Sequence, residues 1–173
     1  MTQIAGEKVV MQTFCETDIT DQYIGWLNDP VTMRFSNHRF LRHDQRSCEC
    51  YLATFANSAN LFFLVSNKTT GSAIGTLTAY VSTVHGTADM GILIGESSAQ
   101  GNGFGLDAWM TLMTHLQDQS YIRKITAGTL ACNTAMLRLA AKAGMVPDGQ
   151  RRLQEVVDGL PQDMLYFAKF AGV

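Results

Sequence analysis

The segment Gln100-Gly-Asn-Gly-Phe-Gly105 combines residue types and a spacing that suit the binding of an anion. Three glycines at alternate positions leave backbone N–H groups unobstructed and permit positive φ angles. An amphipathic pattern follows at once, with apolar residues at Leu106, Trp109, Met110 and Met113. A helix that starts here adds free N–H groups and the positive end of a helix dipole. We therefore expect a phosphate or diphosphate to bind at this loop.

Two other phosphate-binding motifs do not describe this segment. No Lys followed by Ser or Thr closes it, so it is not the P-loop of nucleotide-hydrolysing enzymes. Gly101, Gly103 and Gly105 also lack the G-x-G-x-x-G spacing of a dinucleotide-binding turn. The alternative is a glycine-rich loop shaped only for packing, and the spacing alone does not separate the two hypotheses.

Hydrophobic periodicity predicts the elements that carry this loop. We expect strands over 8–15, 61–65, 73–83, 89–95, 124–130, 150–157 and 164–170, and helices over 17–27, 44–55, 106–116 and 134–143. The links 67–71 and 85–87 are too short for a crossover, so the strands around them form an antiparallel meander. The order is β-α-α-β-β-β-α-β-α-β-β. It predicts a single α/β (α+β) domain over 1–173, with a mixed, mostly antiparallel sheet of about seven strands and four flanking helices.

Composition excludes several classes of function. The 13 Lys and Arg residues against 15 Asp and Glu give a net charge of −2, which argues against nucleic acid as the main partner. Apolar runs such as Leu61–Val65 are far too short to span a membrane, and residues 1–8 lack a signal-peptide pattern. We therefore expect a soluble, cytoplasmic protein.

The cysteines and histidines show no metal-binding pattern. Cys48 and Cys50 are one residue apart, which is not zinc spacing, and no matching pair lies downstream. The four histidines form no pair at helical i, i+4 spacing. Reduced thiols and no metal are expected.

Two motifs together resemble the GNAT N-acetyltransferases. Gln100–Gly105 looks like the Q/R-x-x-G-x-G/A signature of that family, in the same strand–loop–helix context. Asn133–Met145 is similar to its second segment, a helix that begins after Asn and ends in Gly and a large apolar residue. The resemblance covers essentially the whole chain and is closer to the branch containing ribosomal-protein N-terminal acetyltransferases. Trp26–Pro30 and Arg34–Asn37 also look like acetyltransferases of nucleotide-linked amino sugars.

The resemblance implies an N-acetyltransferase that uses acetyl-CoA, in which a primary amine attacks the thioester directly. The diphosphate would bind the loop backbone, and the pantetheine arm would run along the strand before it, between strands that splay apart. A backbone N–H near Leu93–Ile94 would stabilise the oxyanion. Asn133 would hydrogen-bond the pantetheine arm, or serve only as a helix N-cap. The implied cofactor-binding residues are Leu93, Ile94, Gly95, Gln100, Gly101, Asn102, Gly103, Phe104, Gly105 and Asn133.

Catalysis requires a base, because an alkylamine of pKa ~10 is mostly protonated at neutral pH. Asp89 is the first candidate, on the strand that should border the acceptor channel, and His85 is the second, in an expected loop. The alternative for both is ordinary polarity at a strand end. Many family members carry a Tyr and a Ser that here are Ala140 and Met136. No general acid is thus assigned, and a non-catalytic acyl-CoA-binding module remains an alternative.

The acceptor is expected to contact the segment between the first two helices. Residues 34–42 hold three arginines, a histidine and two phenylalanines, which suit a phosphate and a ring. We therefore favour a nucleotide-linked amino sugar over a peptide N-terminus, and Trp26, Asn37, His38 and Arg39 are the candidate contacts. The alternative is a solvated loop. The sequence leaves a homodimer open.

Overall fold

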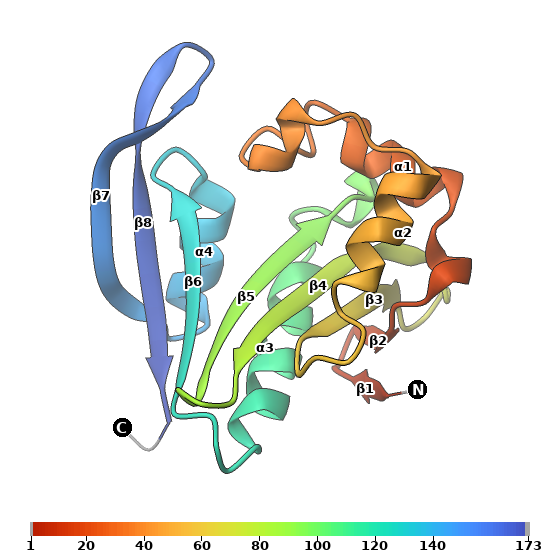
Figure 1. The fold of residues 1–173 in the computed structure, drawn as a ribbon, viewed down its shortest axis with the longest axis horizontal. Coiled ribbons are helices and arrows are strands. Elements are labelled where there is room, and N and C mark those ends of the chain that lie inside the picture. The colour runs from red at the N-terminus through yellow and green to blue at the C-terminus, as the bar shows by residue number, and fades with distance from the viewer. Residues whose placement is uncertain (1, 172–173) are drawn as a thin grey trace.

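The computed structural model describes residues 2–171, which form an eight-stranded sheet in the order β1-β2-β3-β4-β5-β6-β8-β7 (Figure 1). The strands are β1 (Gln3–Ala5), β2 (Val9–Thr13), β3 (Leu61–Asn67), β4 (Ala73–Ser82), β5 (Thr87–Ile94), β6 (Lys124–Leu130), β7 (Val146–Val157) and β8 (Leu160–Phe170). The α-helices are α1 (Asp21–Asn28), α2 (Gln45–Ala53), α3 (Phe104–Gln117) and α4 (Thr134–Lys142). Short 3₁₀ turns cover Glu16–Asp18, Asn37–Phe40 and Ser97–Ala99.

The predicted class and the four helices are confirmed, while the predicted strand number is one too low. The additional strand is β1, whose three residues pair with β2. Three residues are too few to show a period of two, so no pattern marks this strand in the sequence. The first helix begins at Asp21 rather than at residue 17. The Thr20 side chain caps it by accepting a hydrogen bond from the Tyr23 N–H.

Strands β5 and β6 form the only parallel pair of the described sheet, and this pair is short. Only Thr87–Asp89 align with Lys124–Thr126, whereas β6 stays paired with β8 up to Leu130. β5 likewise stays paired with β4 up to Ile94. The two strands therefore diverge beyond Asp89, and Figure 1 shows them part toward the top of the view.

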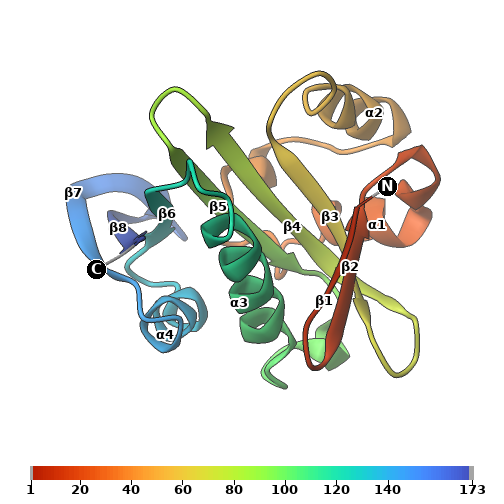
Figure 2. The ribbon, with the colours of Figure 1, turned by 90° about the horizontal axis from the view of Figure 1, so that it is seen from below.

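Helices cover both faces of the sheet, with α3 and α4 on one face and α1 and α2 on the other (Figure 2). The residues of β3 alternate between the two layers. Phe63 and Val65 pack in the core under α3, while Phe62 and Leu64 pack against the α1–α2 layer. Because β3 is buried on both faces, it reads as a continuous apolar run in the sequence.

The N-terminal turn between β1 and β2 is fastened to the first turn of α3. The Asp107 carboxylate accepts hydrogen bonds from the backbone N–H groups of Glu7, Lys8 and Val9, at 3.1, 2.8 and 3.0 Å. An acidic side chain in this first turn also complements the helix dipole. The strand edge and the start of α3 are thereby held in one place.

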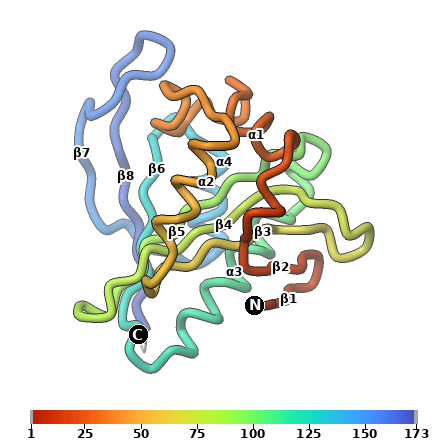
Figure 3. Tube along the Cα trace, turned by 45° about the vertical axis from the view of Figure 1, so that its right-hand side comes forward, coloured from red at the N-terminus to blue at the C-terminus, as the bar shows by residue number. Residues whose placement is uncertain are grey.

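Strands β7 and β8 form a long hairpin at the edge of the sheet, which Figure 3 shows rising beyond its neighbours. Both central residues of its turn, Asp158 and Gly159, have positive φ angles of 50° and 78°. A two-residue turn of this kind is a common hairpin connection. β8 is longer than predicted, because Leu160 and Pro161 belong to it rather than to the turn. β7 is also longer than predicted, because it begins at Val146 rather than at residue 150.

Candidate active site

The loop before α3 leaves its backbone donors free. Within residues 2–171, no protein acceptor takes the six consecutive N–H groups from Gly101 to Leu106. The first N–H in this region to find a partner is that of Asp107, which donates to the Gly103 carbonyl at 3.0 Å. Gly101 and Gly103 have φ angles of +76° and +85°, which glycine adopts without strain. These donors form a site that fits a phosphate or diphosphate.

Three side chains fix the position of this loop by donating hydrogen bonds to backbone carbonyls on the side away from its free N–H groups. Gln100 Nε2 donates to the Ile94 carbonyl at 3.0 Å, and Asn102 Nδ2 donates to the Ser98 carbonyl at 2.8 Å. Lys8 Nζ donates to the Asn102 carbonyl at 3.0 Å. In a trans peptide, C=O and N–H point in opposite directions, so the Gly103 N–H is directed away from Lys8. Lys8 also places a positive charge at a loop that itself contains no Lys or Arg.

At the end of β5, just before this loop, side chains alternate between the two faces of the sheet. Ile94 packs in the core under α3, whereas Leu93 packs on the α1–α2 side. The N–H groups of Gly95 and Glu96 both donate to the Ile74 carbonyl, at 3.0 and 3.1 Å, which ends the regular pairing with β4. A Cβ atom on Gly95 would overlap the Trp26 ring, so glycine is required there by the packing.

A cavity of about 600 Å³ lies between the α1–α2 layer and the sheet. Strands β4 and β5 form part of its floor, through residues that include Thr78, Gly91 and Leu93. Its walls come from α1, α2 and the segment that joins them. The residues of those walls are Tyr23, Leu27, Met33, Ser36, His38, Leu41, Arg42, His43, Ser47, Cys48 and Tyr51. The cavity therefore meets β5 from the face opposite to α3 and α4.

Asp89 lies at the point where β5 and β6 part. It is opposite Tyr80 on β4, so both side chains lie on the cavity face of the sheet. Thr126 Oγ1 donates a hydrogen bond to Asp89 Oδ1 at 2.5 Å. Although Asp89 as a residue is exposed, desolvation of its carboxyl raises its pKa, and the Thr126 hydrogen bond opposes this shift. A raised pKa is what a carboxylate base requires near neutral pH.

His85 is placed elsewhere. It lies in the turn between β4 and β5, on the closed side of the β5–β6 junction, and its carbonyl accepts a hydrogen bond from Arg123 Nε at 2.7 Å. Neither His85 nor Asp89 is among the residues that line the cavity, but Asp89 lies on the cavity face of the sheet whereas His85 lies in the turn. The structure therefore brings Asp89, but not His85, to the face where an acceptor would bind.

Two histidines line the cavity, and the sequence analysis identified only one of them. The His38 and His43 rings are stacked with centroids 5.8 Å apart, and His43 Nε2 lies 3.1 Å from the His38 carbonyl. Burial lowers the pKa of His38, and the neighbouring His43 lowers it further. His43 is only 9% exposed. No spacing in the sequence signals it, because its partners come from the tertiary fold.

The other expected acceptor contacts lie outside the cavity lining. Trp26 is only 7% exposed and belongs to the core beneath Gly95. Asn37 Nδ2 donates to Glu155 Oε1 at 3.0 Å. Arg39 donates to the Val156 carbonyl at 2.8 Å. These contacts connect the segment after α1 to the tip of the β7–β8 hairpin.

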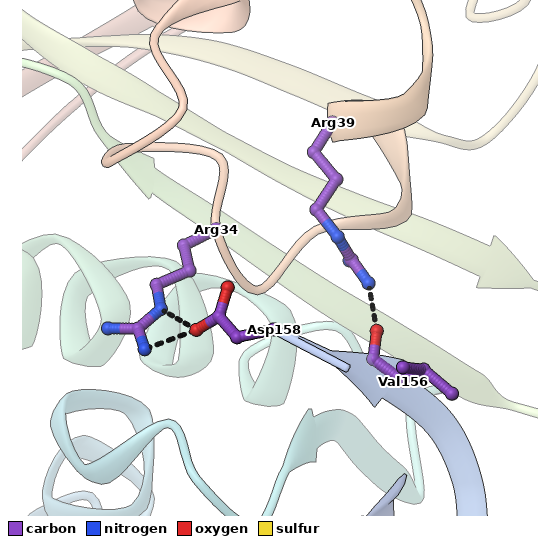
Figure 4. Close-up of polar contacts among 4 residues, drawn as sticks. All are labelled: Arg34, Arg39, Val156 and Asp158. Atoms are coloured by element: carbon purple, nitrogen blue, oxygen red, sulfur yellow. Dashed lines mark hydrogen bonds and ion pairs between the residues drawn. The ribbon is translucent and has the colours of Figure 1, made fainter. Parts of the chain in front are cut away.

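Arg34 makes a further contact of the same kind, an ion pair with Asp158 (Figure 4). Figure 4 shows Arg34 and Arg39 reaching the hairpin side by side. Of the residues expected to contact the acceptor, His38 alone lines the cavity. The arginines of this segment were expected at the acceptor, and the structure places two of them on the hairpin.

Asn133 is the N-cap of α4. Its side chain accepts a hydrogen bond from the Met136 N–H at 3.2 Å and donates one to Thr129 Oγ1 at 3.1 Å. Ala140 is fully buried, and Met136 packs against the core. Neither side chain can donate a proton, so α4 supplies no general acid at these positions.

Within 2–171, no three His, Cys, Asp or Glu side chains gather where they could hold a metal ion. None of the helices in this range is long and apolar enough to cross a membrane.

Solved structures share this fold at low sequence identity. A complex of the ribosomal L7/L12 alpha-N-protein acetyltransferase RimL with coenzyme A has a TM-score of 0.87 at 15% identity, covering 98% of both chains. Spermidine N-acetyltransferase from Vibrio cholerae, with CoA and spermine, has a TM-score of 0.82 at 17% identity, covering 94% of this chain and 95% of its own. A ribosomal-protein-S5-alanine acetyltransferase from Vibrio fischeri has a TM-score of 0.77 at 16% identity, covering 99% and 98%.

Sequence comparison is consistent with this structural likeness. No curated protein sequence matches the chain. The family model described as an acetyltransferase (GNAT) domain matches residues 8–146, which include the loop before α3, the β5–β6 junction and the Asn-capped helix α4. With the fold and this match in agreement, the chain belongs to the GNAT acetyltransferase family.

Proposed function

We propose that this protein transfers an acetyl group from acetyl-CoA to a primary amine, by direct attack within a complex of all three components. One observation carries the proposal: six N–H donors without a partner among residues 2–171 lie just beyond the end of β5, whose edge toward β6 is unpaired after Asp89. An anion held there stands next to a strand that has lost its neighbour on one side. This arrangement suits a diphosphate with a long, hydrogen-bonding arm attached.

The residues present fit acetyl-CoA. The backbone of Gly101–Leu106 would hold the diphosphate, and the free edge of β5 up to Ile94 would align the pantetheine arm. When bound, acetyl-CoA supplies an activated thioester. The chain contributes fixed backbone dipoles near Leu93 and Ile94, which need no reorganisation as negative charge develops on the carbonyl oxygen.

Asp89 is the residue that we assign to proton removal from the amine. Its carboxyl lies on the cavity face and its pKa is raised, so it accepts a proton more readily than an ordinary aspartate. At four residues from Leu93 along an extended strand, it lies roughly 13 Å away, so water must carry the proton between the amine and the carboxyl. The leaving thiolate departs unassisted or takes its proton from water, since Ala140 and Met136 offer none.

The acceptor that we favour is a nucleotide-linked amino sugar, and a protein N-terminus is the second candidate. Aromatic side chains of the cavity offer faces for a ring, and Arg42 offers a guanidinium for a phosphate. The second candidate is supported by the likeness to structures named as ribosomal-protein acetyltransferases. A non-catalytic acyl-CoA-binding module is the alternative from another class, and the absence of a proton donor at residues 136 and 140 favours it.

Release of free CoA thiol from acetyl-CoA, measured with a panel of primary amines, tests the proposal. We expect release that depends on the amine and that is lost in Gly103→Val. CoA binding without thiol release for any amine would instead support the module. Protection against heating by ATP or GTP, but not by CoA, would contradict the assignment of the loop.

A further inference from the structure

We infer that the acceptor carries an acidic group on an aromatic or apolar body, and that Arg42 binds this group. The inference rests on the proposed function, which makes the 600 Å³ cavity the acceptor site. It narrows the acceptor from any primary amine to one class, and it assigns the contact to one of the three arginines of residues 34–42.

The charge of the cavity is the first argument. Among the described residues, no Asp or Glu lines it, and Arg42 is the one side chain in the lining with a permanent charge. The lowered pKa of His38 keeps its ring neutral at pH 7, so it adds polarity without adding charge. An anionic group on the acceptor is therefore matched by the cavity, whereas a cationic tail is not.

The second argument is that Arg42 has no partner. Within residues 2–171 its guanidinium makes no hydrogen bond or ion pair, whereas Arg34 and Arg39 are both engaged with the β7–β8 hairpin. Asp44, two residues away, interacts with Arg42 only at a distance, and its carboxylate is occupied as the N-cap of α2 by Ser47. Arg42 is thus available to form a bidentate contact with a carboxylate or a phosphate.

The remaining walls favour a ring or an apolar body. Tyr51 packs edge-on against Phe62, with centroids 5.5 Å apart, and its hydroxyl lies 2.6 Å from that of Tyr80. Burial raises the pKa of Tyr51 and of Tyr23, so both hydroxyls stay protonated. The cavity therefore offers neutral aromatic surfaces between Arg42 and the backbone of Gly91–Leu93.

Polyamines are excluded by the same reasoning, although a spermidine acetyltransferase shares the fold. A polyamine carries several positive charges beyond the reacting amine. Here these charges would enter a cavity lined by one arginine and no carboxylate. Like charges brought together in one site cost binding energy rather than contribute it.

Matched pairs of amines test the inference by calorimetric binding to the CoA-loaded protein and by thiol release. One arm compares L-phenylalanine with phenethylamine, which lacks the carboxylate. The other compares a uridine-diphosphate-linked amino sugar with the free amino sugar. Spermidine is included as the polycationic amine, which is expected to bind poorly. The variant is Arg42→Gln, and Arg46→Gln is the matched control, because Arg46 does not line the cavity.

We expect the acidic member of at least one pair to bind more tightly, and Arg42→Gln to weaken that binding by about 10- to 100-fold. The member without the acidic group should bind equally well to Arg42→Gln, Arg46→Gln and the parent. Equal or tighter binding of the amines that lack the acidic group, or of spermidine, would overturn the inference and leave the transferase proposal intact. Acidic amines that bind through Arg42 without thiol release would support the inference and contradict the transferase proposal.

Discussion

Asp107 should contribute strongly to stability, because it connects the turn between β1 and β2 to the first turn of α3. Asp107→Ala removes the acceptor of three backbone N–H groups. Those of Glu7 and Lys8 are exposed and can be hydrated, but Val9 is fully buried, so its donor loses a partner at a cost of about 1–3 kcal/mol. The lost interaction with the helix N-terminus adds about 0.3–1 kcal/mol.

We therefore expect Asp107→Ala to lower the free energy of unfolding by about 1–4 kcal/mol, which corresponds to roughly 3–16 °C in Tm for a chain of this size. Urea unfolding followed by the fluorescence of the buried Trp109, together with a thermal scan, measures this. Asp118→Ala, at the exposed C-cap of the same helix, should stay within about 0.5 kcal/mol of the parent. A loss in Asp107→Ala no larger than that of the control would refute the reasoning.

Three further predictions concern the site. Gly103→Val should abolish CoA binding, measured by calorimetry, because a side chain at φ +85° strains the loop and its Cβ would crowd Lys8 Nζ at 3.3 Å, which displaces the backbone donors; Gly71→Val, at φ +74° in an exposed turn, should still bind CoA. Asp89→Asn should lower turnover and remove the acid limb of the pH–rate profile. The parent loses activity as falling pH protonates a carboxyl of raised pKa, so an unaltered limb would dismiss Asp89 as the base. Gly95→Ala should destabilise the fold in urea by about 1–3 kcal/mol, through overlap with the buried Trp26 ring.

Local patterns predicted much of the fold. The glycine-rich loop, the amphipathic helix after it and the antiparallel meander each depend on residues close together in the chain, and the structure has all three. The positions of side chains that bind across the fold were not predictable in this way. Arg34 and Arg39 find their partners 124 and 117 residues later, so a basic, aromatic segment looked like a binding surface when it is in part a structural contact.

The cavity shows the same limit. Arg42 and His43 line it only because their segment, next to α2, lies back over the sheet. No hydrophobic periodicity in the sequence predicts that arrangement. Asp89 was found because a strand places alternate residues on one face, which is a local rule. Local rules therefore predicted the conformation of the glycine-rich loop and the strand that carries Asp89, but not which side chains line the cavity.

The parting of β5 from β6 has a consequence for how the molecule opens. Three residue pairs between β5 and β6 join the two halves of the sheet at one end of the gap. At the other end, the contacts of Arg34 and Arg39 with the β7–β8 hairpin join the α1–α2 layer to the second half. The gap between β5 and β6 is thus closed at one end by backbone pairing and at the other by side-chain contacts. Exposed ion pairs are worth about 0–1 kcal/mol and weaken as ionic strength rises. The distance across this gap at the hairpin end should accordingly change with salt. The backbone pairing that ends at Asp89 should keep the proposed base in place.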